Sequence, residues 1–338
     1  MASADKAPPP ASRGAFRHRG FVLFWIARFL ATFSALVVSV SVGWQVYDLT
    51  RNPFDLGLVG LFQFIPSLLL VLVTGTVSDR YNRRIIVAVC LVAEGGCAAV
   101  LLLMTASGTI SVGPILALLF VFGTARAFMN PAAQSLIPNL VPIEDLASAI
   151  ALSSSSWQVA SIVGPVVGGL LYGVSPDAAY GSALALFLVG ALTIVFVPRP
   201  PQKTLSEPPT WSTVVAGIRY VWHEKIVLGA VSLDLFAVLL GGAVALLPAY
   251  ARDILEVGPW GLGLLRSATG IGAVVMAVYL TLRPIRDHAG LIMFLAVAAF
   301  GVAIVVFGLS RTVWLSVAAL ALAGAADMIS VYVRETLI

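Results

Sequence analysis

The chain has 338 residues, of which 59% are hydrophobic and 11% charged, and its mean hydropathy is +1.00. Soluble domains carry about a quarter charged residues, so this composition excludes a water-soluble enzyme and predicts a protein embedded in a lipid bilayer. The formal net charge is +4, but the basic residues form no patch interleaved with aromatic residues, which argues against a nucleic-acid partner.

Cysteine, histidine and lysine give no indication of a metal, disulfide or nucleotide site. Cys90 and Cys97 lie in one apolar run without the spacing typical of zinc ligands, and the three histidines are scattered along the chain. No lysine follows a glycine, so the phosphate-binding loop of ATPases is absent. We therefore expect no metal and no cofactor.

Long apolar runs predict an all-α membrane protein, because a helix needs about 20 apolar residues to cross a bilayer. About ten such runs are present, at 21–47, 56–77, 85–106, 114–135, 147–174, 178–197, 226–251, 258–282, 290–309 and 312–333.

The polar segments between these runs define the predicted domain organisation. It comprises a cytoplasmic tail (1–20), a six-helix half (21–197), a cytoplasmic linker with an amphipathic helix (198–225) and a second half of four helices (226–338). Most Lys and Arg residues fall in the tail and in the loops on the same side of the spans. By the positive-inside rule, the N-terminus is expected in the cytoplasm.

The second half resembles the first in the positions of some glycines and arginines. Sliding the sequence along itself places Gly123 on Gly324 and, at a nearly equal offset, Gly60 on Gly263 and Arg80 on Arg283. A duplicated six-helix unit is common among secondary transporters. On this hypothesis the second unit lacks two spans, and we expect the sequence to be a fragment of a twelve-helix protein.

A glycine, an aspartate and three arginines stand at fixed spacing between the second and third runs, at Gly75, Asp79, Arg80, Arg83 and Arg84. The stretch GTVSDRYNRR resembles the cytoplasmic signature of the major facilitator superfamily. The resemblance implies two pseudo-symmetric six-helix bundles and a gating role, in which the aspartate braces span two against span eleven and stabilises the outward-open state. Plain anchoring to anionic headgroups explains the arginines but not the glycine and the aspartate.

The fifth run contains Gly164, Pro165, Gly168 and Gly169. This segment resembles part of the signature found in antiporters of the same superfamily. Small residues also let a second helix pack closely, and proline invites a bend, so close packing without a transport role is the alternative interpretation.

Two longer blocks, at 123–142 and 232–251, resemble the bacterial drug-efflux branch that includes enterobactin-exporter-like and macrolide-efflux proteins. The resemblance extends over nearly the whole chain, but it does not fix a substrate.

Ionisable residues inside spans are costly and therefore indicate function. Glu94 and Arg126 stand near the middle of consecutive runs and are expected to form a buried ion pair. A carboxylate that alternates between paired and unpaired surroundings can load and release a proton, whereas a permanent pair is only structural. Asp234 and Asp327 are the corresponding candidates in the second half.

Further polar and aromatic residues inside the runs are candidates for lining a cargo cavity. They are Arg28, Phe33, Gln45, Phe62, Gln63, Trp157, Gln158, Phe236 and Arg266.

We therefore predict a monomeric secondary transporter in the inner or plasma membrane of a bacterium, working by alternating access. It exports an amphipathic small molecule, such as a drug or siderophore-like compound, in exchange for protons, with the proton gradient as energy source. The alternatives are an importer of a small nutrient and a membrane sensor or remnant that transports nothing. No protease or esterase motif supports an enzyme.

Overall fold

The computed structural model describes residues 14–198, 242–285 and 288–337 and a few isolated positions from 219 to 235, and the elements assigned there are all helical. The first half contains α1 (Arg19–Thr50), α2 (Pro53–Leu69), α3 (Val71–Arg80), α4 (Arg83–Ala106), α5 (Val112–Leu136), α6 (Leu146–Val174) and α7 (Pro176–Val195). The second contains α10 (Ala243–Ala249), the π-helix η4 (Tyr250–Ile254), α11 (Pro259–Leu282), α12 (Ala289–Leu309) and α13 (Val313–Leu337).

Within the described residues, eight helices are long and apolar enough to cross a membrane, and a ninth span results if α2 and α3 count as one. These nine correspond to nine of the ten predicted runs. Of the remaining run, at 226–251, only the end is described continuously, as α10 and the start of η4. The linker predicted at 198–225 lies almost wholly outside the described residues.

Helix ends follow local signals in the sequence. The side chain of Asn52 accepts a hydrogen bond from Phe54 N at the start of α2, and Ser175 caps α7 in the same way; each cap is followed by a proline at the first helical position. Asn82 caps α4. Arg51 ends α1 with a left-handed backbone, φ 52°.

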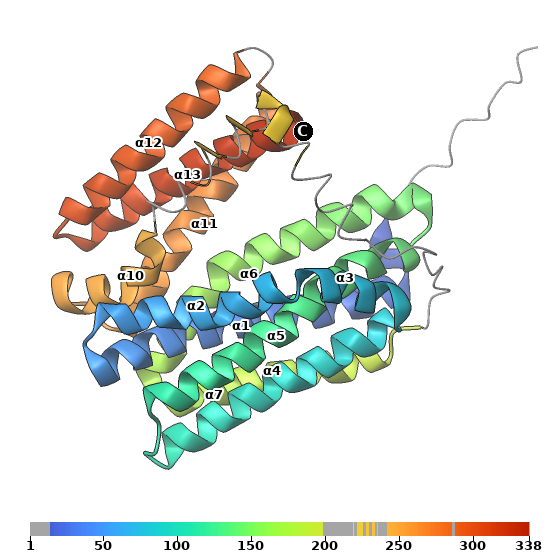
Figure 1. The fold of residues 1–338 in the computed structure, drawn as a ribbon, viewed down its shortest axis with the longest axis horizontal. Coiled ribbons are helices and arrows are strands. Elements are labelled where there is room, and N and C mark those ends of the chain that lie inside the picture. The colour runs from blue at the N-terminus through green and yellow to red at the C-terminus, as the bar shows by residue number, and fades with distance from the viewer. Residues whose placement is uncertain are drawn as a thin grey trace, which may run out of the picture.

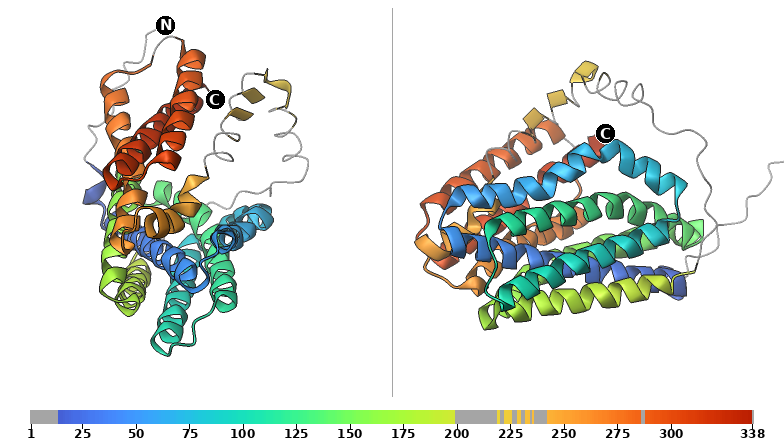
Figure 2. Two further views of the ribbon diagram at one scale, coloured as in Figure 1. Left: turned by 90° about the vertical axis from the view of Figure 1, so that its left-hand side faces the viewer. Right: turned by 60° about the horizontal axis from the view of Figure 1, so that its bottom comes forward.

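The second span is bent. Helix α2 ends shortly after Pro66, and the axis turns by 60° before α3 continues, as the right-hand view of Figure 2 shows. Because proline donates no backbone hydrogen bond and crowds the preceding turn, it accounts for a break at this point.

The same kind of close helix crossing occurs within each half. In the first half, a Cβ added to Gly123 of α5 would lie 2.3 Å from the carbonyl oxygen of Gln63 in α2. In the second, a Cβ on Gly324 of α13 would lie 1.9 Å from the carbonyl oxygen of Thr269 in α11. The glycines that the repeat aligned thus let equivalent helices touch, in agreement with two pseudo-symmetric bundles.

The halves meet at one end of the molecule and separate toward the other (Figure 1). We call the end that holds Thr50 and Val174 the closed end, and the end that holds Arg19 and Arg83 the open end. At the closed end α6 packs against α11, whereas α11 to α13 diverge from the first half toward the open end (Figures 1 and 2).

Candidate functional site

A cavity of about 850 Å³ lies between the halves on the open side, and we call it the inter-half cavity. Its walls are α6 on one side and α11 and α13 on the other, including Ser153, Gln158, Val278 and Met328. Trp157 of α6 borders it with a side chain that is 54% exposed.

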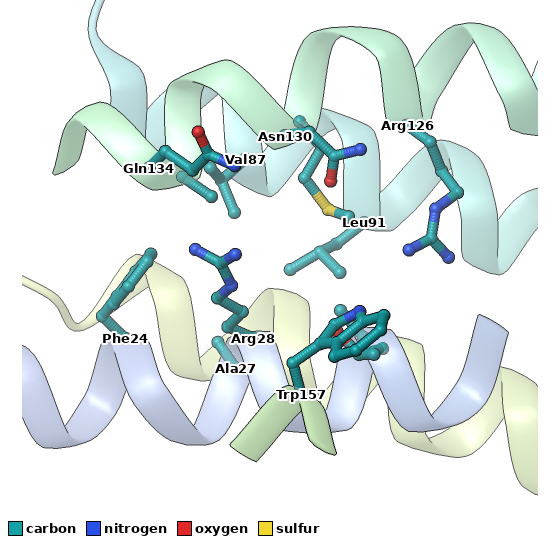
Figure 3. Close-up of a pocket in the computed structure, with 13 residues that line it drawn as sticks. Phe24, Ala27, Arg28, Val87, Leu91, Arg126, Asn130, Gln134 and Trp157 are labelled. Atoms are coloured by element: carbon teal, nitrogen blue, oxygen red, sulfur yellow. The ribbon is translucent and has the colours of Figure 1, made fainter. Parts of the chain in front are cut away.

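A second hollow of about 220 Å³ lies within the first half, and we call it the central pocket. Figure 3 shows the guanidinium groups of Arg28, from α1, and Arg126, from α5, both directed into this space. Asn130, Gln134 and Trp157 complete its polar and aromatic lining, as the same view shows. Because Arg28, Gln134 and Trp157 also line the inter-half cavity, the two spaces adjoin.

These residues sit at mid-depth in the membrane. Arg28, Arg126 and Trp157 each lie about ten residues from the open end of their helix, or roughly 15 Å at 1.5 Å per residue. The hydrocarbon core is about 30 Å thick, so the central pocket lies near its middle. Secondary transporters bind their cargo at this depth.

The ion pair predicted between Glu94 and Arg126 is not formed in this conformation, and that prediction is wrong for the state described. Glu94 is fully buried in α4, and neither of its carboxylate oxygens has a hydrogen-bond partner. The Arg126 guanidinium instead lies 6.0 Å from the centre of the Phe122 ring and faces the central pocket. A fully buried carboxylate without a hydrogen bond is costly to ionise.

Arg266 connects the two halves. It projects from α11 and donates a hydrogen bond of 2.9 Å from Nη1 to Ser39 Oγ of α1, while its Nε is buried without a partner. Within the described part of the chain, no carboxylate forms an ion pair with Arg28, Arg126 or Arg266.

Other predicted cavity residues lie elsewhere. Gln45 is buried in a hydrogen-bond network, in which its Oε1 accepts from Tyr180 at 2.7 Å and its Nε2 donates to Thr105 at 3.1 Å. Phe33 and Phe62 pack against the apolar core. Gln63 lies at the crossing of α2 with Gly123 rather than on either cavity wall.

The second-half candidates contribute no described side chain to the two cavities. Asp234 and Phe236 fall outside the described residues, and Asp327 is exposed on α13. Sequence reasoning missed Asn130 and Thr32, which line the central pocket. Asn130 stands one turn after Arg126 on α5, and this helical spacing was the signal available for it.

The antiporter-like segment forms the seam between the halves. A Cβ on Gly169 would lie 2.3 Å from the carbonyl oxygen of Pro259, and one on Gly263 would lie 2.3 Å from that of Pro165. Gly164 and Gly168 face α1 with added-Cβ distances of 3.0 Å. These glycines therefore let α6 pack against α1 and α11 together.

Side chains from α1 and η4 join the halves at the closed end, and we call Tyr47, Asp48, Arg51, Arg252 and Asp253 the closed-end cluster. Arg252 pairs with Asp48 and lies 5.4 Å from the centre of the Trp44 ring. Tyr47 donates a hydrogen bond to Asp253, which also pairs with Arg51 at 3.3 Å. Opposite charges at the ends of the first and seventh predicted runs were the signal for this cluster.

The basic signature lies at the open end. Arg83 donates to the carbonyl oxygen of Ser135 at 2.8 Å and lies 3.5 Å from Asp79, while Arg84 donates to that of Val197 at 2.6 Å. These bonds hold the last turn of α5 and the segment after α7 against α4. Arg80 is exposed, and a Cβ added to Gly75 would meet no atom within 4 Å among the residues that the structure describes.

Comparisons with known proteins agree with this architecture. A family model described as a transmembrane secretion effector matches residues 11–335. The enterobactin exporter EntS of Shigella boydii is 27% identical over 329 residues, covering 95% of this chain and 77% of the relative, and that of Escherichia coli matches to the same extent.

Among solved structures, an inward-facing, unoccupied bacterial homologue of the human lysosomal transporter Spinster has a TM-score of 0.67 at 16% identity, covering 98% of this chain and 76% of that chain. A mutant of the nucleoside transporter NupG has a TM-score of 0.73 at 13% identity, covering 94% and 82%. At these identities the likeness concerns the fold.

The family match spans nearly the whole chain, and the helices form the same two-bundle arrangement as these transporters. The protein is therefore a multi-pass membrane transporter rather than an enzyme. The chain belongs to the transmembrane secretion effector family of the major facilitator superfamily.

Proposed function

We propose that the protein exports an amphipathic small molecule from the cytoplasm of a bacterium, driven by inward flow of protons. The observation that carries the proposal is a polar, tryptophan-lined pocket at mid-depth that adjoins a cavity between the halves. The similarity to enterobactin exporters supports the outward direction. We propose that it works as a monomer.

The open end is the cytoplasmic end in this proposal, because the arginine-rich loop that begins α4 lies there and positive loops favour the cytoplasm. The structure then corresponds to the state that loads cargo from inside the cell. Release requires the seam of α6 and α11 to part while the open end closes.

Glu94 is the proposed proton carrier. It lies on the same face of α4 as Val87 and Leu91, which line the central pocket, and its carboxyl group has no partner here. An uncharged carboxyl group can stay in this apolar site, whereas an ionised one needs a partner such as Arg126 in the other state. Alternation between the two would couple proton release to cargo movement.

The test uses purified protein in proteoliposomes with an imposed pH gradient and three fluorescent amphipathic compounds, one anionic, one neutral and one cationic. We expect at least one compound to move against its gradient, and a protonophore to stop it. Glu94→Gln should abolish the pH-driven component, whereas Glu144→Gln, the same change at an exposed position just before α6, should retain it. Movement of none of the three, or unchanged pH-driven movement in Glu94→Gln, would refute the proposal.

A further inference from the structure

Two positive charges share the central pocket, and in the described part of the chain neither forms an ion pair. Arg28 and Arg126 both point into a space of about 220 Å³ (Figure 3). The Nη1 atom of Arg28 is buried and has no hydrogen-bond partner. No carboxylate lies within ion-pairing distance of either guanidinium among the residues the structure describes.

This arrangement is unfavourable unless an anion joins it. Charges at mid-bilayer depth cost at least about 2.5–3.5 kcal/mol each on insertion scales, and two like charges in one pocket add repulsion. Ordinarily such residues pair with an acidic residue of a neighbouring helix. Glu94, the buried carboxyl group of the adjacent helix α4, pairs with neither arginine in this state.

The remaining lining completes a site for an acidic group. Thr32, Asn130 and Gln134 add neutral hydrogen-bonding groups around the two guanidiniums. A guanidinium presents parallel N–H groups that match the oxygens of a carboxylate, sulfonate or phosphate. The same two positive charges repel a cationic compound.

The space beside this site is suited to an apolar body. Trp157 borders both cavities, and the facing wall of the inter-half cavity carries Val274, Ala277 and Val278 of α11. An aromatic or aliphatic group attached to the acidic group would extend from the arginines across Trp157 toward α11.

We propose that the cargo is an amphipathic organic anion, whose acidic group binds between Arg28 and Arg126 and whose apolar body lies against Trp157. The inference rests on the proposed transport function for its meaning, but it concerns binding and is tested without a gradient. In the state described here, Arg126 would bind the cargo, whereas in the other state it would pair with Glu94.

The experiment compares dansylglycine, which carries a carboxylate, with its methyl ester, which lacks the charge. Binding is measured by calorimetry on the full chain in nanodiscs of zwitterionic lipid, which bind little anion themselves. We expect wild type to bind the acid at least tenfold more tightly than the ester. Arg28→Gln and Arg126→Gln should each reduce that preference about tenfold, whereas the ester's affinity should change little.

Two controls keep the result interpretable. Arg311→Gln removes the same charge from an exposed site at the closed end and should leave the preference intact. Arg28→Lys and Arg126→Lys keep the charge and should retain most of it, even if a glutamine variant fails to fold. Equal affinity of wild type for acid and ester, no measurable binding of the acid, or a preference that survives both glutamine changes would overturn the inference.

The outcome is separate from that of the transport assay. A preference for the acid with no pH-driven movement would refute proton-coupled export and leave the anion site standing. Proton-coupled movement confined to neutral or cationic compounds would do the reverse.

Discussion

The open end and the closed end of the molecule are each stabilised by a different kind of contact. At the closed end, glycines let the backbones of α6 and α11 touch, and the closed-end cluster adds side-chain pairs around the seam. At the open end, Arg83 and Arg84 bond carbonyl groups within the first half. The bonds found at the open end thus stabilise one half, whereas those at the closed end join the two halves.

The contacts at the closed end differ in their free-energy contribution. Exposed ion pairs contribute about 0.2–1 kcal/mol each, and Asp48, Arg51 and Asp253 are about half exposed. Forcing additional atoms into a packed seam typically costs about 1–3 kcal/mol. We infer that backbone packing holds the end shut and that the ion pairs adjust the balance between states.

The largest expected effect comes from the seam. Gly169→Ala places a Cβ where the carbonyl oxygen of Pro259 lies 2.3 Å away, so the backbones must move apart. A cost of about 1–3 kcal/mol shifts the equilibrium away from the closed seam by roughly 5- to 150-fold. Distances between spin labels on α6 and α11 at the closed end should lengthen, and transport should fall.

Gly173→Ala is the matched control, because it lies one turn further along α6 and has nothing within 4 Å of an added Cβ. Its label distances should equal those of wild type. If Gly169→Ala behaves in the same way, backbone contact at the seam does not hold the closed end.

A smaller effect is expected from the pair of Asp48 and Arg252. Asp48→Arg or Arg252→Asp alone should lower the ratio of molecules with a closed seam to molecules with an open seam by up to about fivefold, because an exposed pair contributes up to about 1 kcal/mol. The same label distances report this ratio. The charge-exchanged double variant should recover part of the wild-type ratio. Additive single effects would show that the two side chains do not interact.

The smallest effect concerns the segment that precedes α1 at the open end. Asp145 accepts a hydrogen bond from Gly14 N at 3.1 Å and contacts His18 Nε2 at 2.9 Å. Asp145→Asn should speed hydrogen exchange of residues 14–18 a few-fold, since it removes the charge that the histidine contacts. Transport should change little, because this contact lies within the first half.

Asp177→Asn, the same change on the exposed first turn of α7, should leave exchange at residues 14–18 as in wild type. Exchange in Asp145→Asn that matches wild type would show that the contact does not order the segment.

Local sequence was sufficient to predict most of the fold. Apolar length predicted the spans. The caps at Asn52, Asn82 and Ser175, which the structure shows, are local signals that begin three helices. The glycines aligned by the repeat, Gly123 and Gly324, proved to occupy equivalent crossings. These features depend on neighbours in the sequence or on a pattern repeated along it.

The candidate site was predictable only in part. Of the candidates for a cargo cavity, Arg28 and Trp157 lie on the wall of the central pocket, whereas Gln45 is hydrogen-bonded to Tyr180 and Thr105. Polarity inside a span indicates that a residue needs a partner. It does not indicate whether that partner is another helix or a cargo.

The sequence by itself determined that the chain is a helical membrane protein with a basic signature at one end. Only the tertiary structure decided that Arg126 lines the central pocket with Arg28 and makes no hydrogen bond to Glu94, and that Asp48 pairs with Arg252. The physical reason is that spacing along one helix fixes which residues share its face. The rotation and depth of one helix against another depend on small-residue contacts between distant segments, such as Gly169 with Pro259.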